Sequence, residues 1–308
     1  GYMRRTITES LRAQEESGYD LSLLFGIQNF YDKFGYRRVW ADEVVTVNRR
    51  KLDTLAAFDP AIDARVFAES AVDTGKFAEL SNREMETVTG TFVRPNYRTN
   101  RRPTAWRALT WKDQSADLEG YVIYEPDGEH VLLVDYAGDP GHVLAALRYA
   151  VQKHDAGSVR FFGIPKRSRL GIAIRQGDAK FSGRYVREGG AMARIVNPRS
   201  TFEKLCPELS RRLSGSGFAS WSGGLVLEYR DAVRIGLSVD TGRVAVAPDL
   251  RTDAVVSGGD DLVHLVFGGE DPEILLAAGT IQATPSAVPL LRALFPAQDP
   301  TIPEWDRF

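Results

Sequence analysis

The sequence predicts a mixed protein of α/β and α+β type that is built from more than one domain. Its 308 residues exceed the usual size of a single domain, so two or three domains are expected. Stretches with a helical spacing of apolar residues alternate along the chain with short strand-like runs. The turn sequences Pro126-Asp127-Gly128 and Asp240-Thr241-Gly242 lie between such runs and predict antiparallel hairpins.

The composition is that of an ordinary globular protein. Hydrophobic residues make up 43% of the chain and charged residues 26%, and the net charge of -2 gives no general attraction to nucleic acid or anionic membranes. No apolar run approaches the roughly 18 residues needed to cross a bilayer, and no signal-peptide pattern opens the chain. The single cysteine, Cys206, excludes an internal disulfide framework and fits a reducing compartment. We therefore expect a cytoplasmic protein without nucleic-acid partners or membrane insertion.

The first part of the chain predicts a helix, a strand, a short helix and a second strand. Met3, Ile7 and Leu11 have helical spacing, and the helix over residues 3–16 ends at Ser17-Gly18. Residues 19–25 predict a strand ended by Gly26, residues 29–34 a brief helix stopped by Gly35, and residues 39–47 another strand. Residues 53–64 predict a linker.

The start of the chain has two interpretations. Gly1-Tyr2-Met3 enters a helix at once, without a preceding strand. Either Gly1 remains from a purification tag, or the chain is the later part of a longer protein.

The middle part predicts a strand near Arg65, a helix over 73–86 and the hairpin of 121–124 with 130–134. A helix over 142–154 and a strand over 159–165 follow. The intervening residues 94–103 predict an exposed basic loop, with Tyr97 among the arginines Arg94, Arg98, Arg101 and Arg102.

The last part predicts an antiparallel sheet that is combined with helices. Strands are expected over 191–196, 225–229, 233–239 and 242–247. Helices are expected over 201–213, 260–267, 271–278 and 287–295, before an extended tail over 296–308. Gly189-Gly190 is interpreted as the mark of a second domain boundary.

Several common kinds of site are absent from the sequence. The four histidines, His130, His142, His154 and His264, have no metal-ligand spacing with one another or with Cys206, so no metal site is expected. The chain carries no nucleophile elbow, P-loop or dinucleotide-binding glycine pattern. Cys206 lies on an amphipathic stretch without a nearby histidine, which favours a packed side chain over a nucleophile.

One segment carries a more specific pattern. Residues 23–36 read Leu-Leu-Phe-Gly-Ile-Gln-Asn-Phe-Tyr-Asp-Lys-Phe-Gly-Tyr, which resembles the F-Y-x-[KR]-F-G-Y signature of GNAT-superfamily N-acetyltransferases. The form is that of the enhanced-intracellular-survival group, whose members end in a sterol-carrier-like domain. The aromatic end Trp305-Asp306-Arg307-Phe308 also resembles that group. The resemblance covers essentially the whole chain.

The resemblance implies three domains. Residues 1–58 would be the C-terminal part of a catalytic acetyltransferase domain, and residues 59–188 a second, degenerate acetyltransferase-like domain. Residues 189–308 would form the sterol-carrier-like α+β domain. The first strands of the catalytic domain would precede Gly1, and their absence would expose an edge of the strand over 21–25.

The resemblance also implies acetyl-CoA as co-substrate. Gly1, Tyr2, Met3 and Arg4 would form the end of the loop whose backbone amides bind the CoA pyrophosphate at a helix N-terminus. Two residues depart from the family pattern: Met3 stands where the signature has glycine or alanine, and Leu24 where many members have asparagine.

The implied catalytic residues are Tyr31 and Phe308. Tyr31 would protonate the departing sulfur as general acid, and an ordinary phenol with a pKa near 10 is protonated at neutral pH. The α-carboxylate of Phe308 would accept the proton of a primary amine as general base. Asp32, Glu304 and Asp306 would add negative charge, so polyamines and aminoglycoside-like cations are the expected acceptors. The group assembles into dimers or hexamers, which implies a homo-oligomer.

An alternative from another class remains open. The protein would then be a non-catalytic binding protein that holds an apolar ligand in its last domain.

Overall fold

The computed structural model describes residues 1–27, 29–55, 68–70, 74–95, 105–112, 115, 117–185 and 188–307. The chain forms two compact units, each built from two separate stretches of sequence. Unit 1 consists of Gly1–Ala41 and Tyr185–Gln298, and unit 2 consists of Asp42–Arg184 and Asp299–Phe308. This grouping follows contacts in space, whereas the three predicted domains follow sequence order. The division into residues 1–58, 59–188 and 189–308 therefore stays a prediction.

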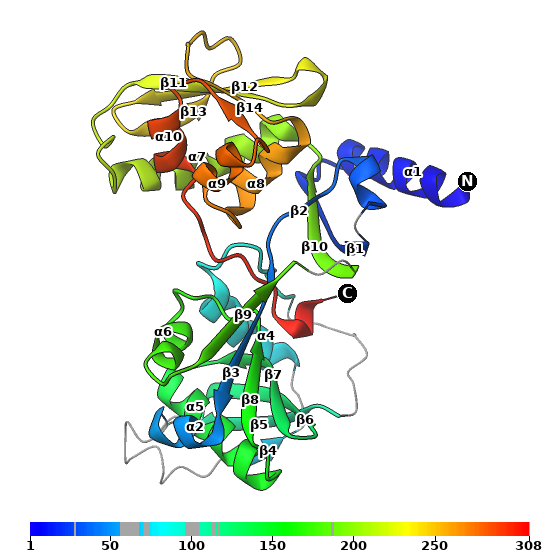
Figure 1. The fold of residues 1–308 in the computed structure, drawn as a ribbon, viewed down its shortest axis with the longest axis vertical. Helices are drawn as coiled ribbons and strands as arrows, with labels where there is room; N and C mark the ends of the chain where they lie inside the picture. The colour runs from blue at the N-terminus through cyan, green and yellow to red at the C-terminus, as the bar shows by residue number, and fades with distance from the viewer. Residues whose placement is uncertain are drawn as a thin grey trace. The chain divides into compact units, whose positions relative to one another are not determined.

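Unit 2 is organised around a seven-stranded sheet (Figure 1). In spatial order its strands are β4 (Ala68–Ser70), β5 (Arg107–Lys112), β6 (Leu118–Asp127), β7 (His130–Ala137), β8 (Ser158–Phe162), β3 (Asp42–Asn48) and β9 (Lys180–Arg184). All neighbours are antiparallel except β7 and β8, which are parallel. Helix α5 (Pro140–Lys153) connects that parallel pair, because parallel neighbours need a crossover.

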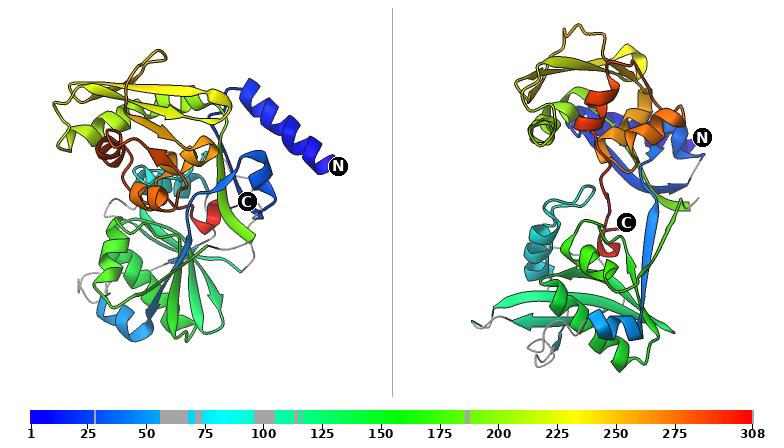
Figure 2. Two further views of the ribbon diagram at one scale, coloured as in Figure 1. Left: turned by 45° about the horizontal axis from the view of Figure 1, so that its top comes forward. Right: turned by 60° about the vertical axis from the view of Figure 1, so that its left-hand side comes forward.

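Both faces of this sheet are covered. Along β6, Val122 and Tyr124 point into one apolar core with helices α2 (Arg49–Leu55), α5 and α6 (Arg169–Arg175). Tyr121 and Ile123 point into a second core with helix α4 (Thr74–Met85) and the short η5 (Glu304–Asp306). The alternation follows from the two-residue period of a strand. In the right-hand view of Figure 2, α4 and α2 lie on opposite sides of the sheet.

Unit 1 contains a small sheet made from both of its stretches of sequence. β10 (Glu188–Ile195) lies between β1 (Leu21–Ile27) and β2 (Arg37–Arg38), antiparallel to both. Gly189 and Gly190, interpreted above as a domain boundary, lie inside β10, where Gly190 stands opposite Gly26. β1 is an edge strand of the sheet as described. Helix α1 (Tyr2–Glu16) precedes it and has no buried residue.

The rest of unit 1 is a five-stranded sheet with helices against it (Figure 1). The strands in spatial order are β13 (Arg243–Val246), β12 (Arg234–Asp240), β11 (Gly223–Glu228), β14 (Val255–Ser257) and β15 (Gln282–Ala283). The helical segments are α7 (Pro198–Ser214), η3 (Arg230–Ala232), η4 (Gly259–Leu262), α8 (Val263–Phe267), α9 (Pro272–Ala277) and α10 (Val288–Leu294).

Most predicted elements are confirmed, within a few residues at their ends. They include α1, β1, the short helix η1 (Tyr31–Phe34), α4, the β6–β7 hairpin, α5, α7 and the β11–β13 strands. The linker prediction over 53–64 is wrong for its first residues, because α2 continues to Leu55 and buries Leu52 and Leu55. The rest of that segment lies outside the described residues. β5, α6 and β9 were not predicted.

The prediction of an extended tail is only partly correct. Glu304–Asp306 form the 3-10 helix η5, and Trp305 and Asp306 are buried. A Trp side chain carries enough apolar area to fold a short segment onto a core. In the described part of the chain, no helix combines the length and apolarity that a bilayer crossing requires.

Candidate active site around Tyr31

Tyr31 lies on a tight turn that directly follows β1. Asn29 adopts a left-handed backbone with φ 67, and its N–H donates to Asp32 Oδ2 at 2.7 Å. The 3-10 helix η1 then runs from Tyr31 to Phe34 and closes at Gly35, whose φ of 79 favours glycine. The turn therefore has its own hydrogen bonds and a glycine cap, which fix the backbone that carries the Tyr31 side chain.

The Tyr31 ring packs among aromatic neighbours and against Gly26. It meets the Phe30 ring edge-on at 4.9 Å and the Tyr36 ring at 5.9 Å. A β-carbon at Gly26 would come within 2.7 Å of Tyr31 Cδ2 and would also meet Leu24. Gly26 thus leaves the space that the ring fills. Tyr31 is half-buried, so its ring is held while part of the side chain stays accessible.

Tyr36 packs against the Tyr31 ring and is hydrogen-bonded to β1. Its hydroxyl forms a 2.7 Å hydrogen bond with Ser22 Oγ of β1. Burial raises the pKa of Tyr36, and the Ser22 hydrogen bond offsets this only in part. Tyr36 is therefore a neutral, packed side chain at physiological pH.

A cluster of charged residues holds the two ends of the Tyr31 turn. Arg37 of β2 donates from Nε to Asp261 Oδ1 at 2.9 Å, and its Nη2 lies 3.7 Å from Asp260 Oδ2. Arg194 of β10 donates from Nη1 to the Phe34 carbonyl. Tyr229 donates to Asp260 Oδ1 at 3.1 Å. These residues come from β2, β10, η4 and the position just after β11, all within unit 1. Apart from Arg37, they lie more than 150 positions from the turn in sequence.

The electrostatics of this cluster depend on burial. Burial raises the pKa of Asp261, and the Arg37 charge acts against this increase. Burial, followed by the Arg37 charge, lowers the pKa of His264 to about 4, although its Nε2 lies 3.8 Å from Asp261. His264 is therefore neutral at pH 7. Burial likewise raises the pKa of Tyr229 to about 12.

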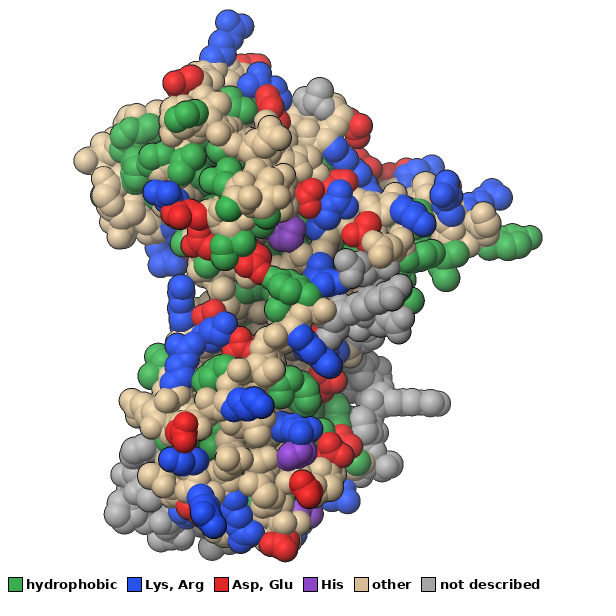
Figure 3. All heavy atoms as spheres, in the orientation of Figure 1, with side chains coloured by type: hydrophobic (Ala, Val, Ile, Leu, Met, Phe, Trp, Pro, Cys, Tyr) green, Lys and Arg blue, Asp and Glu red, His purple; other side chains and the backbone are tan. Residues whose placement is uncertain are grey.

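The predicted CoA-binding residues lie at the start of α1. Gly1 is the N-cap and has no side-chain cap, so the first N–H groups of the helix have no side-chain acceptor. Tyr2 and Met3 are 93% and 59% exposed. The assignment of Gly1, Tyr2, Met3 and Arg4 to the CoA pyrophosphate stays a prediction. Hydrophobic side chains along α1 are uncovered in Figure 3.

Phe308, the predicted base, lies outside the described residues. The residues before it belong to unit 2. They show that the negative charge expected from Asp306 for an amine acceptor is already paired within the protein. Asp306 is buried and paired with Arg94 at 2.8 Å, so it is not a free negative charge for an acceptor. Glu304 lies 3.4 Å from Arg307 Nε. Because Arg307 is also paired with Asp42, the charge of Glu304 is compensated only in part.

The exposed-loop prediction is wrong for Arg94. Its side chain is buried between Asp135 and Asp306, which it contacts at 2.6 and 2.8 Å. Arg98, Arg101, Arg102 and Tyr97 lie outside the described residues.

The remaining chemical candidates have structural partners. His130 Nδ1 bonds with Ser158 Oγ at 2.7 Å, and His154 Nε2 with the Tyr124 hydroxyl at 3.3 Å. The Cys206 thiol donates to the Phe202 carbonyl, and burial raises its pKa, which opposes nucleophilic reactivity. Cys206 is thus a packed helix residue.

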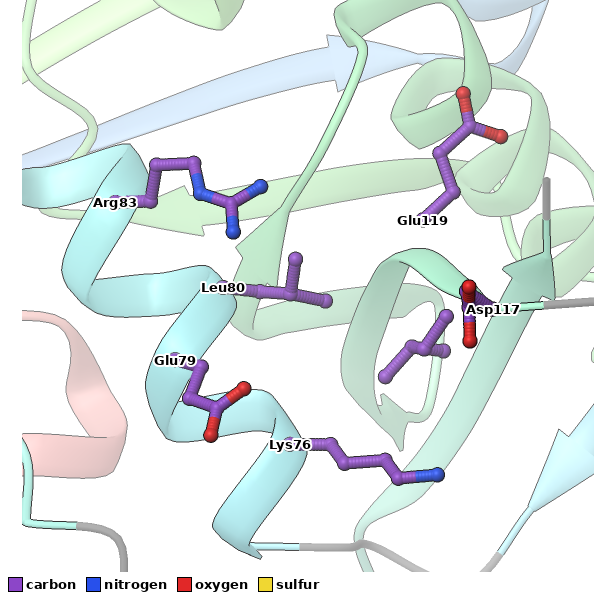
Figure 4. Close-up of a pocket in the computed structure, with 7 residues that line it drawn as sticks. Lys76, Glu79, Leu80, Arg83, Asp117 and Glu119 are labelled. Carbon is purple, nitrogen blue, oxygen red and sulfur yellow. The ribbon is translucent and has the colours of Figure 1, made fainter. Parts of the chain in front are cut away.

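A separate cavity lies in unit 2 between α4 and the start of β6 (Figure 4). It has a volume of about 430 Å³. Its lining carries both signs of charge and consists of Lys76, Glu79, Leu80, Arg83, Asp117, Leu118 and Glu119. Neither Tyr31 nor a residue of α1 lines it.

Solved structures of acetyltransferases share the architecture of this chain. A GCN5-related N-acetyltransferase from Kribbella flavida aligns with a TM-score of 0.67 and 18% identity, over 97% of this chain and 74% of its own. The chain has the fold of a GCN5-related (GNAT) acetyltransferase. A second such enzyme, from Anabaena variabilis, aligns with a TM-score of 0.69 and 18% identity, over 96% and 75%. Eis1 from Mycobacterium abscessus aligns with a TM-score of 0.62 and 18% identity, over 100% and 78%.

At 18% sequence identity, the similarity to these structures shows a common fold and nothing more specific. No family model matches the chain, and no curated protein matches it by sequence. The GNAT fold inferred from residues 23–36 is confirmed, while the roles of individual residues stay predictions.

The sequence pattern singles out Tyr31, whose role stays a prediction, but it does not indicate the cluster that holds the Tyr31 turn. Arg37 directly follows the signature, yet its partners Asp260 and Asp261 lie more than 220 residues later. No local pattern signals such a pairing. Gly26 was interpreted only as the end of a strand, and β1 in fact continues through it to Ile27.

Proposed function

We propose that this protein is an acetyl-CoA-dependent N-acetyltransferase that acts on a primary amine by direct transfer. The GNAT fold over nearly the whole chain supports the reaction class. The observation that carries the proposal is the position of Tyr31. It lies on a braced turn after β1, with its ring against Gly26 and its side chain half-buried. A fixed, partly accessible phenol suits a proton donor.

In this proposal two residues of the chain move protons. Acetyl-CoA supplies the acetyl thioester. The Tyr31 hydroxyl donates its proton to the sulfur as the carbon–sulfur bond breaks, and the Phe308 α-carboxylate accepts the proton that the amine loses as it is acylated. The N–H groups at Gly1, Tyr2, Met3 and Arg4 bind the pyrophosphate at the start of α1.

Within the acetyltransferases, we assign the protein to the enhanced-intracellular-survival type. In it, residues 189–308 form a sterol-carrier-like domain, and the protein acts in the cytoplasm as a dimer or hexamer. Polyamines and aminoglycoside-like cations are the proposed acceptors. Because Asp306 and Glu304 are paired with arginines, this preference rests on Asp32, which is half-buried beside Tyr31.

The experiment uses the full-length natural protein. Acetyl-CoA is expected to raise its melting temperature, because a ligand that binds the folded state stabilises it. Release of free thiol is expected with spermidine or kanamycin as acceptor, and desulfo-CoA serves as a binding control without transferable acetyl. If acetyl-CoA gives no thermal shift and native mass spectrometry finds a retained lipid, the protein is instead the non-catalytic binding protein.

A further inference from the structure

The cavity shown in Figure 4 belongs to unit 2 alone, because its lining residues all come from α4 and from residues 117–119. Its volume of about 430 Å³ is within the range of sites that bind small molecules. Helix α4 forms one wall, and the start of β6 forms the other. The cavity therefore has a defined place in the fold of unit 2.

Helix α4 is held in place by residues that do not line the cavity. Phe77 is 2% exposed and stacks on the Tyr121 ring, with the ring centroids 4.1 Å apart. Asn82 donates to the Arg94 carbonyl at 2.8 Å and accepts from the Arg94 N–H at 2.7 Å. Because these contacts fix the rotation of the helix, residues 76, 79, 80 and 83 present one constant face to the cavity.

Leu80 and Leu118 give the cavity an apolar surface. Both leucines line the cavity and pack against the apolar core that contains Phe77. The start of β6 is itself tightly packed, because a β-carbon at Gly120 would meet the Trp111 ring. An aliphatic chain that lay on the two leucines would remove further apolar surface from water, which is favourable.

Two side chains of opposite charge line the cavity without a partner. Glu79 and Arg83 are four residues apart on α4, a spacing at which Glu and Arg side chains commonly pair. In the part of the chain that the structure describes, however, neither side chain forms a hydrogen bond or an ion pair. Figure 4 shows them on the two sides of Leu80, both extending from the helix on its cavity side. The other charged lining residues, Lys76, Asp117 and Glu119, take part in interactions of their own.

This arrangement complements a molecule that carries both charges. Its ammonium group would pair with Glu79 and its carboxylate with the fork of Arg83, while an aliphatic spacer covered Leu80. A guanidinium and a carboxylate form one of the stronger kinds of charged hydrogen bond. Because β-carbons four residues apart on a helix are separated by about 5–6 Å, the two charges of the ligand must lie several carbon atoms apart.

We propose that the cavity binds a small ω-amino acid, a molecule with an ammonium and a carboxylate group at the two ends of a short aliphatic chain. A single exposed ion pair contributes little, because water screens it and the side chain must be ordered. Two pairs made by one ligand share the entropic cost of association. A ligand with both charges therefore binds more tightly than a ligand with either charge alone. The proposed acetyl transfer uses no residue of this cavity, so the two proposals are independent.

The test measures the binding of 4-aminobutyrate to the full-length natural protein by ligand-observed NMR, without acetyl-CoA. Butyrate and n-butylamine serve as probes that keep only the carboxylate or only the ammonium group. A Kd of about 1 mM is expected for 4-aminobutyrate, a weak affinity typical of a ligand with few atoms. Each probe with a single charge is expected to bind about fivefold more weakly.

Two variants assign the two charges of the ligand to their partners. Arg83→Gln is expected to weaken the binding of 4-aminobutyrate about fivefold and to weaken butyrate, without weakening n-butylamine. Glu79→Gln is expected to weaken 4-aminobutyrate by a similar factor and to weaken n-butylamine, without weakening butyrate. Both side chains are exposed, so neither substitution should change the melting temperature noticeably.

Asp127→Asn and Arg184→Gln control for the change of net charge. Asp127 lies at the other end of β6 and Arg184 in the edge strand β9, and both are exposed. These variants should bind all three probes as the natural protein does. The proposal fails if 4-aminobutyrate does not bind, or binds no more tightly than butyrate and n-butylamine. It also fails if Glu79→Gln and Arg83→Gln bind 4-aminobutyrate as well as the two control variants do.

Discussion

At the scale of single residues, Gly26 has the most direct effect on Tyr31. A β-carbon there would lie 2.7 Å from Tyr31 Cδ2 and close to Leu24. Gly26→Ala is therefore expected to displace the Tyr31 ring and to lower kcat about tenfold or more, because reacting groups tolerate little displacement. Steady-state thiol release measures this.

A matched control exists for this substitution. Gly183 is also in a strand, β9, and a β-carbon there would meet nothing within 4 Å. Gly183→Ala is expected to change neither kcat nor stability noticeably. Equal kcat values for the two alanine variants would contradict the assigned packing of Tyr31.

His264 predicts a pH dependence of stability. Its pKa is lowered from 6.5 to about 4 in the folded protein, mainly by burial. Between these values the unfolded chain binds the proton and the folded chain does not, so stability falls as the pH drops from about 6.5 to 4. The loss from this residue is up to about 3 kcal/mol.

The measurement is the free energy of unfolding in urea at pH 4.5 to 7.5, for the natural protein and for His264→Gln. The difference between the two free energies of unfolding isolates the contribution of His264, because Asp261 and the other carboxyl groups titrate in both proteins. A difference that does not vary with pH would show that His264 is not held neutral.

At the scale of elements, η4 and β2 hold the Tyr31 turn in place through the Arg37–Asp261 pair, which we call the brace. Arg37 and Asp261 are joined by a 2.9 Å hydrogen bond between partly buried side chains. A double-mutant cycle with Arg37→Gln and Asp261→Asn is expected to give a coupling energy of about 1 kcal/mol or more, as for a hydrogen bond between charged groups. Each single variant should also lower kcat several-fold.

The exposed pair Arg199–Glu203 on α7 provides the comparison. Its cycle is expected to give only about 0.3 kcal/mol, and its variants should leave kcat alone. The assignment of the brace fails if the two cycles give the same coupling.

Elements with strong local patterns could be predicted from the sequence, and the others could not. Helix α5 shows its periodic apolar face, and the β6–β7 hairpin has a clear turn sequence. By contrast, β9 (Lys180–Arg184) is exposed along its whole length, so it has no alternation of buried and exposed residues to detect. The tail was predicted to be extended because it contains three prolines, whereas the burial of Trp305 and Asp306 depends on the distant Arg94. Local sequence specifies the Tyr31 turn but not its long-range partners.

At the scale of the whole molecule, both units combine stretches that are far apart in sequence. β10 supplies the central strand between β1 and β2. A fragment of residues 1–58 would lack that strand, and we expect it to remain unfolded, because β1, β2 and β3 would all lack the strands they pair with. Circular dichroism and amide chemical-shift dispersion of the fragment measure this. A folded fragment would support an independent first domain instead.

The central claim is that Tyr31 is the proton donor of an acetyltransferase. The most direct measurement compares kcat for Tyr31→Phe and Tyr36→Phe in the full-length natural protein, with acetyl-CoA and spermidine. Both variants remove one hydroxyl from neighbouring rings and keep the aromatic packing. We predict that Tyr31→Phe loses about a hundredfold or more in kcat with little change in the KM for acetyl-CoA, as expected for a general acid. Tyr36→Phe should lose mainly about 1 kcal/mol of stability, through its bond to Ser22. Equal kcat values for Tyr31→Phe and the natural protein would contradict the claim.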